Sequence, residues 1–594
     1  MWPFLNNYPL QRLEQVASKE YDYIIVGGGT SGCAVASRLS ENPNVKVLLL
    51  ERGGLDDSWL SRIPLISVAR GNDVVYQPAE LGAETGNRQG HIMAAEKLGG
   101  NSRINGMIYT RSIPAYYTQW AMLGHPTWGW DDVHPYFSSV EHIQGQPASA
   151  GAVHIQRHTP STRLYEYLED SAQTMGLCVD ANLQDPTSSG VGYFGLSLTL
   201  DQKGYRHSAD RAYLPQHLVT QRKGHLDICT GVTVSSLEFS KSRDTATGVI
   251  VRQTNATQSQ HDMQIVAKRE IILCAGAIRS PQILQLSGIG PENVVTKFNI
   301  AARHRMEGVG KSLVDHALIP LCIHVDSRDT LHQMMQNPLQ AAKHFLLFAM
   351  TGEGWMKSSI ERAIFFNTAD LHRETVKFSG KQRSTDDLKQ ESIPNAEILV
   401  VPANAKPEAY PDSAAMTLQV MLNQPFSRGS VEIQSTDPAV SPKISLNMLS
   451  DARDREVARD ALRFALHLAE HFVQSSGYPY PGTRVLGVLG ASPSWRDVSD
   501  EDLDEYISRN IEPAWHVTSS CRMGRRDEGG VVDDELRVHG LTNLRIADAS
   551  VLPRIPCMHP MATVYMVGER CADLVKRAWD GAGGGAGSGH SAEV

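Results

Sequence analysis

The fold is decided by one short stretch, residues 21–32, with the sequence Tyr21-Asp22-Tyr23-Ile24-Ile25-Val26-Gly27-Gly28-Gly29-Thr30-Ser31-Gly32. Its first half is apolar and typical of a β-strand, and its second half has glycines in the spacing G-x-G-x-x-G. A helix-forming segment follows at 33–39, and a second apolar segment at 45–50 ends in Glu51. Strand, helix and strand in this order, with an acidic residue at the end, predict a βαβ unit that binds a dinucleotide.

Each glycine of the motif has a physical role. Gly27 permits the tight turn, Gly29 lets the backbone approach a pyrophosphate, and Gly32 lets the helix pack closely on the strand. The free N–H groups at the start of the helix, with the positive end of its dipole, bind phosphates. The Glu51 carboxylate accepts hydrogen bonds from ribose hydroxyls. A glycine-rich turn is weak evidence by itself, and the motif does not distinguish FAD from NAD.

The bulk properties exclude several classes of protein. A chain of 594 residues exceeds one ordinary hydrophobic core, so two or more structural units are expected. The net charge of -9 argues against a nucleic-acid partner, because no surplus of basic residues can neutralise phosphates. No apolar run approaches the length of a membrane span. Because a signal peptide and a peroxisomal tripeptide are not recognisable, we expect a cytoplasmic protein.

The eight cysteines lie far apart without a C-x-x-C pair, and we expect them to be buried, reduced thiols. No cluster of residues predicts a metal site. The polar stretch 371–393 is expected to be a surface loop, and the Gly/Ser-rich tail 581–594 is expected to be disordered.

Two later segments resemble further strands of the nucleotide-binding unit. They lie at 269–277 and 544–550, and each ends in small residues. Ligands of open α/β sheets bind beyond the carboxyl ends of the strands, so these ends are expected to border one crevice. The nucleotide-binding domain is therefore expected to be discontinuous in sequence. Between these segments, an alternating strand at 427–433 and an amphipathic helix at 454–470 indicate a substrate-binding cap.

Four segments resemble the signatures of one known family. They are residues 98–109 (LGGNSRINGMIY), 276–290, 515–524 and 559–566. The first two resemble the two signatures of the glucose–methanol–choline (GMC) oxidoreductases, and the last two resemble their active-site segments. Together with the glycine motif, the resemblance extends from about Tyr21 to Ala578, nearly the whole chain.

The resemblance implies an α/β fold in which a discontinuous Rossmann-like FAD-binding domain faces an α+β substrate-binding domain built on an antiparallel sheet. The FAD-binding domain is expected at 18–150, 225–325 and 501–580, the last part carrying the active-site segments. The substrate-binding domain is expected at 326–500, and 151–224 is a mixed connecting segment.

The resemblance also implies which residues bind FAD. Thr30 and Ser31 lie at the pyrophosphate turn, Glu51 and Arg52 lie at the adenosine ribose, and the backbone of Val234 meets the adenine. Asp548 and Ala549 lie near the ribityl chain and the pyrophosphate. Residues 105–108 pass the isoalloxazine ring. The other expected cofactor-binding residues are Gly27, Gly29, Gly32, Asn105, Gly106, Met107, Ile108, Pro560 and Met561.

Three positions bear on the flavin itself. Glu96 stands where the family usually has a basic or small residue, and Asn101 stands where it usually has Gly, Ser or Thr. Both lie on the loop that is expected to contact the flavin. Members with covalent flavin can use a histidine directly before the signature asparagine. That position is Ile104 here, so we expect FAD to be bound non-covalently.

Two histidines are the candidate catalytic residues. Oxidation of an alcohol removes the hydroxyl proton and passes a hydride to flavin N5, and neutral imidazole is a base of suitable pKa. The resemblance assigns the base to His516, and assigns to His559 a hydrogen bond to the substrate oxygen. Five others of the 22 histidines are interpreted as ordinary surface or core residues: His125, His134, His304, His316 and His467. Cys521 and Arg522 are interpreted as structural.

We therefore expect FAD-dependent oxidation of a primary or aryl-type alcohol. A non-redox lyase or cyclase that keeps FAD as a structural group is the alternative, which the unusual Glu96 and Asn101 leave open. The partner is a small-molecule alcohol. The sequence determines neither its identity, nor the electron acceptor (oxygen or another), nor the oligomeric state.

Overall fold

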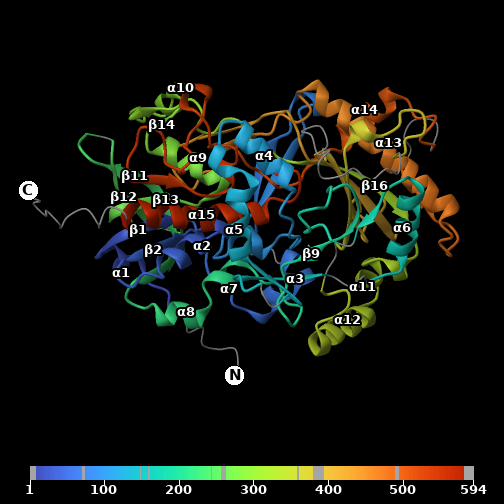
Figure 1. Cartoon of the computed structure of the whole chain (residues 1–594), viewed down its shortest axis with the longest axis horizontal. Helices are drawn as coiled ribbons and strands as arrows, with labels where there is room; N and C mark the ends of the chain where they lie inside the picture. The colour runs from blue at the N-terminus through green and yellow to red at the C-terminus, as the bar shows by residue number, and fades with distance from the viewer. Residues whose placement is uncertain are drawn as a thin grey trace, which may run out of the picture.

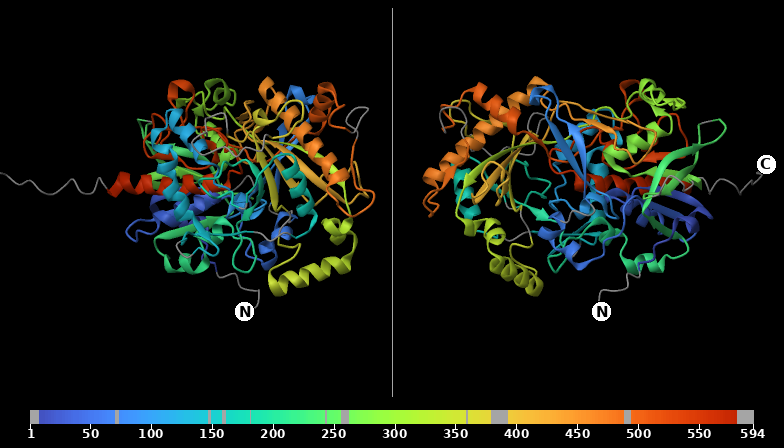
Figure 2. Two further views of the ribbon diagram at one scale, coloured as in Figure 1. Left: turned by 45° about the vertical axis from the view of Figure 1, so that its right-hand side comes forward. Right: turned by 180° about the vertical axis from the view of Figure 1, so that it is seen from behind.

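The computed structural model describes residues 8–69, 74–146, 149–157, 161–180, 182–242, 244–255, 262–357, 360–378, 393–487 and 494–580. The expected tail at 581–594 and most of the loop expected at 371–393 lie outside these residues. Two large β-sheets stand side by side with helices around them, one in the left half and one in the right half of Figure 1. The two turned views of Figure 2 show the same division.

The first sheet is the predicted nucleotide-binding sheet, with the strand order β10-β2-β1-β13-β12-β11 and with β24 beside β13. The pairs among β10, β2, β1, β13 and β24 are parallel, whereas β11 and β12 are antiparallel additions. Strands that are distant in sequence thus end at one edge of the sheet, as expected. Their bounds are β1 Glu20–Val26, β2 Val47–Glu51, β10 Leu226–Thr230, β11 Val232–Phe239, β12 Ala246–Gln253, β13 Met263–Leu273 and β24 Leu544–Ile546.

The glycine motif joins β1 to α2 (Thr30–Leu39) at this edge. Gly27 has φ +103°, which favours glycine, and a Cβ on it would lie 2.5 Å from the Cys274 carbonyl oxygen. A Cβ on Gly32 would lie 1.9 Å from the Gly27 carbonyl oxygen, so only glycine allows α2 to approach β1 this closely. The C-terminal helix α15 (Met561–Asp580) packs on α2 and on α5 (Trp130–Val140).

The second sheet has the strand order β22-β16-β19-β18-β17-β8-β7, with β23 beside β16. Neighbouring strands in this sheet are antiparallel, except that β7 and β8 are parallel to each other. The bounds are β7 Val179–Asp180, β8 Gly192–Gly195, β16 Ala317–His324, β17 Arg362–Phe366, β18 Ala396–Val401, β19 Ala415–Leu422, β22 Arg484–Val485 and β23 Glu512–Pro513. The long helix α13 (Ala452–Ser475) packs against β16, β18 and β19 and contains the helix expected at 454–470.

The strand expected at 427–433 is shorter in the structure and belongs to neither large sheet. It is β20 (Ser430–Glu432), and it forms a four-stranded sheet with β21 (Lys443–Ser445), β3 (Val74–Glu80) and β4 (Gln89–Ala95). A segment from the middle of the chain therefore joins strands from its first hundred residues. The bounds of the predicted domains stay a prediction.

The remaining helices and small strands surround these sheets, with α12 at the outer rim in Figures 1 and 2. Helix bounds are α1 Leu13–Ala17, α3 Pro64–Ala69, α4 Pro114–Met122, α6 Leu164–Thr174, α7 Ala209–Tyr213, α8 Gln216–Gln221, α9 Gly276–Leu286, α10 Glu292–Thr296, α11 His332–Gln336, α12 Pro338–Thr351 and α14 Asp500–Asn510. The small strands are β5 Glu141–Ile143, β6 Val153–Arg157, β9 Ser197–Leu198, β14 Ile289–Gly290 and β15 His304–Arg305. Among the described residues, no helix combines the length and apolar character that crossing a membrane requires.

Candidate active site

A cavity of about 500 Å³ lies between the two large sheets. The carboxyl ends of the nucleotide-binding strands line one part of it, and β16, β18 and β19 line another. It brings together residues from all parts of the chain: Gly27, Gly29, Thr30, Ser31, Glu51, Arg52, Asn105, Gly106, Met107, Ile108, Val234, His516, Asp548, Ala549, His559, Pro560 and Met561. Of the predicted site residues, only Gly32 does not line the cavity, because it packs against Gly27 behind the turn.

The start of α2 forms the phosphate-binding part of the cavity. Its N-cap is Gly29, which offers no side-chain cap, so the first N–H groups of the helix are directed to the cavity that Thr30 and Ser31 line. Glu51 lies beside this turn, where Oε2 accepts the Gly28 N–H at 2.7 Å and Oε1 accepts the Gly53 N–H at 2.8 Å. Burial raises the pKa of Glu51, and these N–H groups act in the opposite direction.

The side-chain contacts of Glu96 explain why an acidic residue is accepted at this position. Its Oε1 lies 2.9 Å from Nε of Arg52 and 3.2 Å from Nη2 of Arg279, so one carboxylate joins two guanidinium groups. Arg52 also donates to the Thr233 hydroxyl at 3.3 Å, next to Val234. Glu96 therefore lies beside Arg52 and Thr233, in the part of the cavity expected to hold the adenosine, and its expected contact with the flavin stays a prediction.

The segment 105–108, expected beside the flavin, has an unusual backbone. Met107 has φ +62°, in the left-handed region, and its N–H is held by Oδ1 of Asn105 at 3.0 Å. Behind this segment, Arg206 donates to Oδ1 and to the carbonyl of Asn105 at 2.9 and 2.7 Å. Arg206 is buried, and within the described residues no carboxylate forms an ion pair with it. Burial, reinforced by the charge of Arg103, lowers the pKa of Arg206 to about 9.

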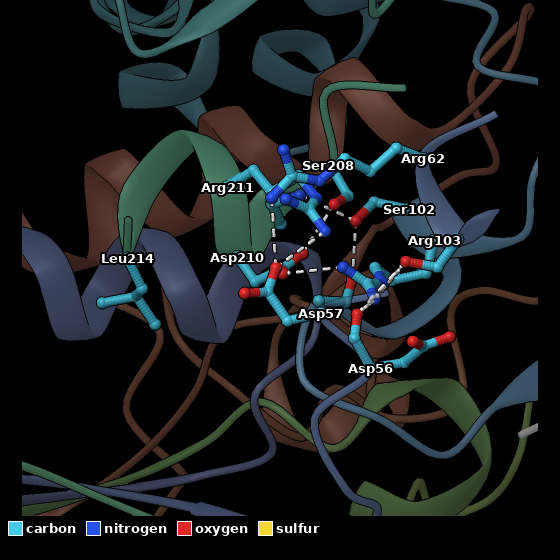
Figure 3. A network of polar contacts seen from close by, with 12 residues as sticks. Asp56, Asp57, Arg62, Ser102, Arg103, Ser208, Asp210, Arg211 and Leu214 are labelled. Carbon is cyan, nitrogen blue, oxygen red and sulfur yellow. Dashed lines mark hydrogen bonds and ion pairs between the residues drawn. The ribbon is translucent and has the colours of Figure 1, made fainter. Parts of the chain in front are cut away.

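An ion-pair network fixes the turn that precedes this segment (Figure 3). Arg103 donates to Oδ2 of Asp210 at 2.9 Å and also to the carbonyl of Asp56, and the Ser208 hydroxyl donates to Oδ1 of Asp210 at 2.6 Å. The side chains of Arg103 and Asp210 are 1% and 6% exposed, so the pair is buried. Asp57, also labelled in Figure 3, pairs instead with Arg62 and Arg211.

The other two sequence departures also line the cavity. Asn101 accepts the Ala95 N–H with Oδ1 at 2.9 Å, a contact made by a side-chain amide that the usual Gly, Ser or Thr lacks. Ile104 follows it at the end of the same turn and presents a hydrocarbon side chain to the cavity. An aliphatic side chain has no nucleophilic atom to form a covalent flavin bond.

His516 and His559 lie together at the second-sheet end of the cavity, with ring centroids 4.9 Å apart and planes at 79°. Nε2 of His559 lies 3.1 Å from Oε1 of Glu397, which is fully buried. Nδ1 of His516 lies 3.0 Å from Nδ1 of His316. Each candidate catalytic histidine therefore has its own partner, a carboxylate for one and an imidazole for the other.

Burial and the two neighbouring histidines lower the pKa of His516 well below its ordinary value of 6.5. The His516 ring is thus neutral and able to accept a proton. Its backbone is held by Asp315, whose carboxylate accepts the N–H groups of His516 at 2.6 Å and of Trp515 at 3.1 Å. Trp515 has φ +63°, a conformation that is rare for a bulky side chain and that these bonds maintain.

Four residues around the site were not predicted from the sequence: Asp315, His316, Glu397 and Arg206. His316 is a buried residue, as expected, but the interpretation as an ordinary one missed its contact with His516. Glu397 gave a usable signal, because it is a single charged residue within the otherwise apolar strand β18. The remaining histidines interpreted as ordinary do not line the cavity, and neither do Cys521 and Arg522.

The residues present fit a flavin dinucleotide. The uncapped start of α2 suits a pyrophosphate, and Glu51 and Arg52 lie where a ribose is expected beyond β2. The cavity then continues past 105–108 to the histidine pair, which would place a ring system between the phosphate-binding turn and the second sheet. Nothing in this donor set calls for a different group.

Comparisons with known proteins agree with this site. Residues 21–318 and 425–568 match the family models described as GMC oxidoreductase. The chain is 31% identical to an oxygen-dependent choline dehydrogenase of Vibrio vulnificus over 94% of both chains. It is also 31% identical to a glucose dehydrogenase [FAD, quinone] of Drosophila pseudoobscura pseudoobscura, over 94% of this chain and 87% of that one.

The fold matches solved structures equally well. A formate oxidase variant of Aspergillus oryzae RIB40, studied for FAD modification, superposes with a TM-score of 0.81 at 25% identity, covering 95% of this chain and 99% of that one. The predicted Rossmann-like fold, the FAD cofactor and the family are thus confirmed. The chain belongs to the GMC oxidoreductases, a family of FAD-binding flavoproteins.

Proposed function

We propose that this enzyme oxidises an uncharged primary or aryl-type alcohol, with His516 as the base that takes the hydroxyl proton. The observation that carries the proposal is the histidine pair at the end of a cavity whose other end is built for a dinucleotide. Bound FAD supplies the acceptor for the hydride that leaves the carbinol carbon. The protein's own part is to hold the alcohol, remove its proton and exclude water.

The two histidines have different parts in this chemistry. His516 is neutral and has Nδ1 turned to His316, so Nε2 is the nitrogen available to a substrate hydroxyl. His559 has Nε2 on Glu397, which leaves Nδ1 for the substrate oxygen. A hydrogen bond from this ring to the substrate oxygen stabilises the developing alkoxide.

The cavity wall beside the histidines favours an apolar alcohol. Leu318 lies on β16, directly after His316 and Ala317. Leu399 lies two residues beyond Glu397 on β18, so the side-chain alternation of the strand brings Leu399 and Glu397 to the same face. Met421 pairs with both strands, and all three side chains line the cavity. The charged lining residues belong to the dinucleotide end: Glu51, Arg52, Glu96, Arg279 and Asp548.

This wall offers few partners for a polyol or a quaternary ammonium group. Glu397, the carboxylate nearest the histidines, is paired with His559 and receives the Asn423 amide at 3.4 Å. Although relatives are named for choline and glucose, we infer that this chain prefers benzyl-type or aliphatic primary alcohols.

The test is anaerobic reduction of the bound flavin by a panel of alcohols. Benzyl alcohol and hexanol should bleach the flavin absorbance at lower concentrations than choline or glucose. Bleaching by choline or glucose alone would replace the proposed substrate class. If no alcohol bleaches the flavin and a non-redox product accumulates, the enzyme is a lyase or cyclase that keeps FAD as a structural group.

A further inference from the structure

His316 has a hydrogen-bond environment that fixes the position of its own proton. Its side chain is fully buried, and Nε2 lies 3.1 Å from the carbonyl oxygen of Asn423 and 3.0 Å from that of Pro556. Both partners of Nε2 are acceptors only. An unprotonated Nε2 would place its lone pair against two carbonyl oxygens, so Nε2 carries the hydrogen and donates it to them.

The other nitrogen of His316 is therefore an acceptor. Complete burial lowers the pKa of His316 to about 3, and the neighbouring His559 adds to this shift, so the ring is neutral. A neutral imidazole with a protonated Nε2 has a lone pair on Nδ1. That lone pair faces Nδ1 of His516 at 3.0 Å, and two lone pairs cannot share this contact.

We infer that His316 is a positioning residue that keeps His516 in the tautomer with a protonated Nδ1 and a free lone pair on Nε2. The inference rests on the proposed function, in which Nε2 of His516 takes the hydroxyl proton. Asp315, the residue before His316, holds the backbone N–H of His516 at 2.6 Å. The dipeptide Asp315-His316 thus fixes both the backbone and the ring of the base.

The proton balance follows directly from these contacts. When the alcohol O–H bond breaks, its proton moves to Nε2 of His516, and the electron pair stays on the substrate oxygen. The resulting imidazolium keeps its Nδ1–H on the lone pair of His316. His316 passes no proton on, because its Nε2–H already points at two carbonyl oxygens. The acceptor on His316 also holds the orientation of the His516 ring, one of the tasks of the aspartate in a Ser-His-Asp triad.

The test compares three variants of the FAD-loaded enzyme. His316→Phe keeps a ring but removes the acceptor, whereas His316→Gln keeps an acceptor oxygen and a donor N–H in one side chain. His467→Phe is the matched control, because His467 is also buried, 7% exposed, and also contacts a backbone carbonyl, that of Val376 at 3.3 Å.

We expect His316→Phe to slow anaerobic flavin reduction by about 10- to 1,000-fold, below the roughly 10⁴-fold loss seen when a triad histidine takes the wrong tautomer. The rate–pH profile should also shift, because His316 is one of the groups that set the pKa of His516. His316→Gln should recover most of the rate, and His467→Phe should leave it unchanged. FAD content should be similar in all three variants.

The groups that face His516 and affect this profile are His316, His559, Asp315 and, through His559, Glu397. A second measurement does not depend on activity. In ¹⁵N-histidine-labelled protein, the His516 signals, assigned by their loss in His516→Asn, should show a protonated Nδ1 and an unprotonated Nε2, and His316→Phe should change this pattern.

Wild-type reduction rate and pH profile in His316→Phe would overturn the inference, as would an unprotonated Nδ1 on His516. An equal loss in the Phe and Gln variants, together with lower FAD content, would show that His316 is only structural. These outcomes are distinct from a failure of the proposed function, in which no alcohol reduces the flavin of the wild-type enzyme.

Discussion

At the scale of single residues, the two candidate catalytic histidines differ in the charge of their partners. His559 contacts the buried carboxylate of Glu397, whereas His516 contacts the neutral ring of His316. Two protonated rings with centroids 4.9 Å apart would repel each other in a buried site. The arrangement therefore separates the two tasks, and leaves His516 as the neutral base.

This difference predicts the effect of removing the base. His516→Ala should slow anaerobic flavin reduction by about 10²–10⁴-fold, the usual contribution of an acid–base catalyst. FAD content should hardly change, since His516 lies at the substrate end of the cavity. Stopped-flow measurement of flavin absorbance gives the rate, and the absorbance of the purified protein gives the FAD content. A variant that reduces its flavin at the wild-type rate would remove His516 from the mechanism.

The pH dependence should carry the same signature. The base must be unprotonated, and burial keeps the pKa of His516 below 6.5, so the wild-type rate should rise with pH and reach its plateau below pH 6.5. A wild-type rate that rises only well above pH 7 would show that a group other than His516 controls the pH dependence.

The His559→Asn variant should lose less of the flavin-reduction rate than His559→Ala, because an amide still donates a hydrogen bond to the substrate oxygen.

At the scale of elements, the turn η4 (Gly100–Arg103) and the segment after it depend on a buried ion pair. Arg103 reaches back to the Asp56 carbonyl and across to Asp210, in the helix α7 (Figure 3). This pair joins three separate parts of the chain directly behind the residues expected to hold the flavin. Its loss should therefore affect both the stability of the fold and the cofactor.

Asp210→Asn leaves the Arg103 charge buried without its partner. We expect a loss of about 3–5 kcal/mol in the free energy of unfolding, the usual cost of breaking a buried pair, together with a lower FAD content. Asp57→Asn is the matched control in the same network, since its carboxylate is 35% exposed and one of its two partners, Arg62, is 40% exposed. That control should cost only about 0–1 kcal/mol. Equal losses in urea unfolding of the two variants would contradict the special role of the buried pair.

The elements that the sequence predicted best are those with local signals. β1, α2 and β2 follow one another, and their glycines act within the same turn, so a short stretch contains the information. The partners of the histidines carry no such signal. His559 and Glu397 are 162 positions apart, and His516 and His316 are 200 positions apart. Their meeting depends on how strands of the second sheet pair, and hydrophobic periodicity does not specify that pairing.

Glu96 shows a different limit of the sequence. The family pattern marks it as unusual, but the pattern does not reveal that Arg52 and Arg279 compensate its charge. An acidic residue at position 96 is explained only by the two arginines that contact it. Glu96 and Arg279 are 183 positions apart, so their contact appears only in the folded chain.

At the scale of the whole molecule, the site exists only where the two large sheets meet. The nucleotide-binding sheet supplies the phosphate-binding turn and Glu51, and the second sheet supplies Glu397 and the apolar wall. His516 belongs to the chain that follows β23, a strand of the second sheet, and Asp548 follows β24, a strand of the first. A ligand that occupies the whole cavity therefore contacts both halves and should hold them together.

Removal of FAD should lower the stability of the whole chain. A ligand that binds only the folded state stabilises it by about 2.7 kcal/mol at a free concentration of 100 times its Kd. Calorimetry of apoprotein should therefore show an unfolding temperature that rises with added FAD. ADP should raise it less, because ADP fills the adenosine and pyrophosphate part and does not reach the second sheet. ADP that stabilises as strongly as FAD would show that the flavin does not bridge the two sheets.

Acid precipitation of the holoenzyme should release the yellow flavin into the supernatant, as expected with Ile104 next to the signature asparagine. Flavin that stays on the denatured protein would contradict non-covalent binding.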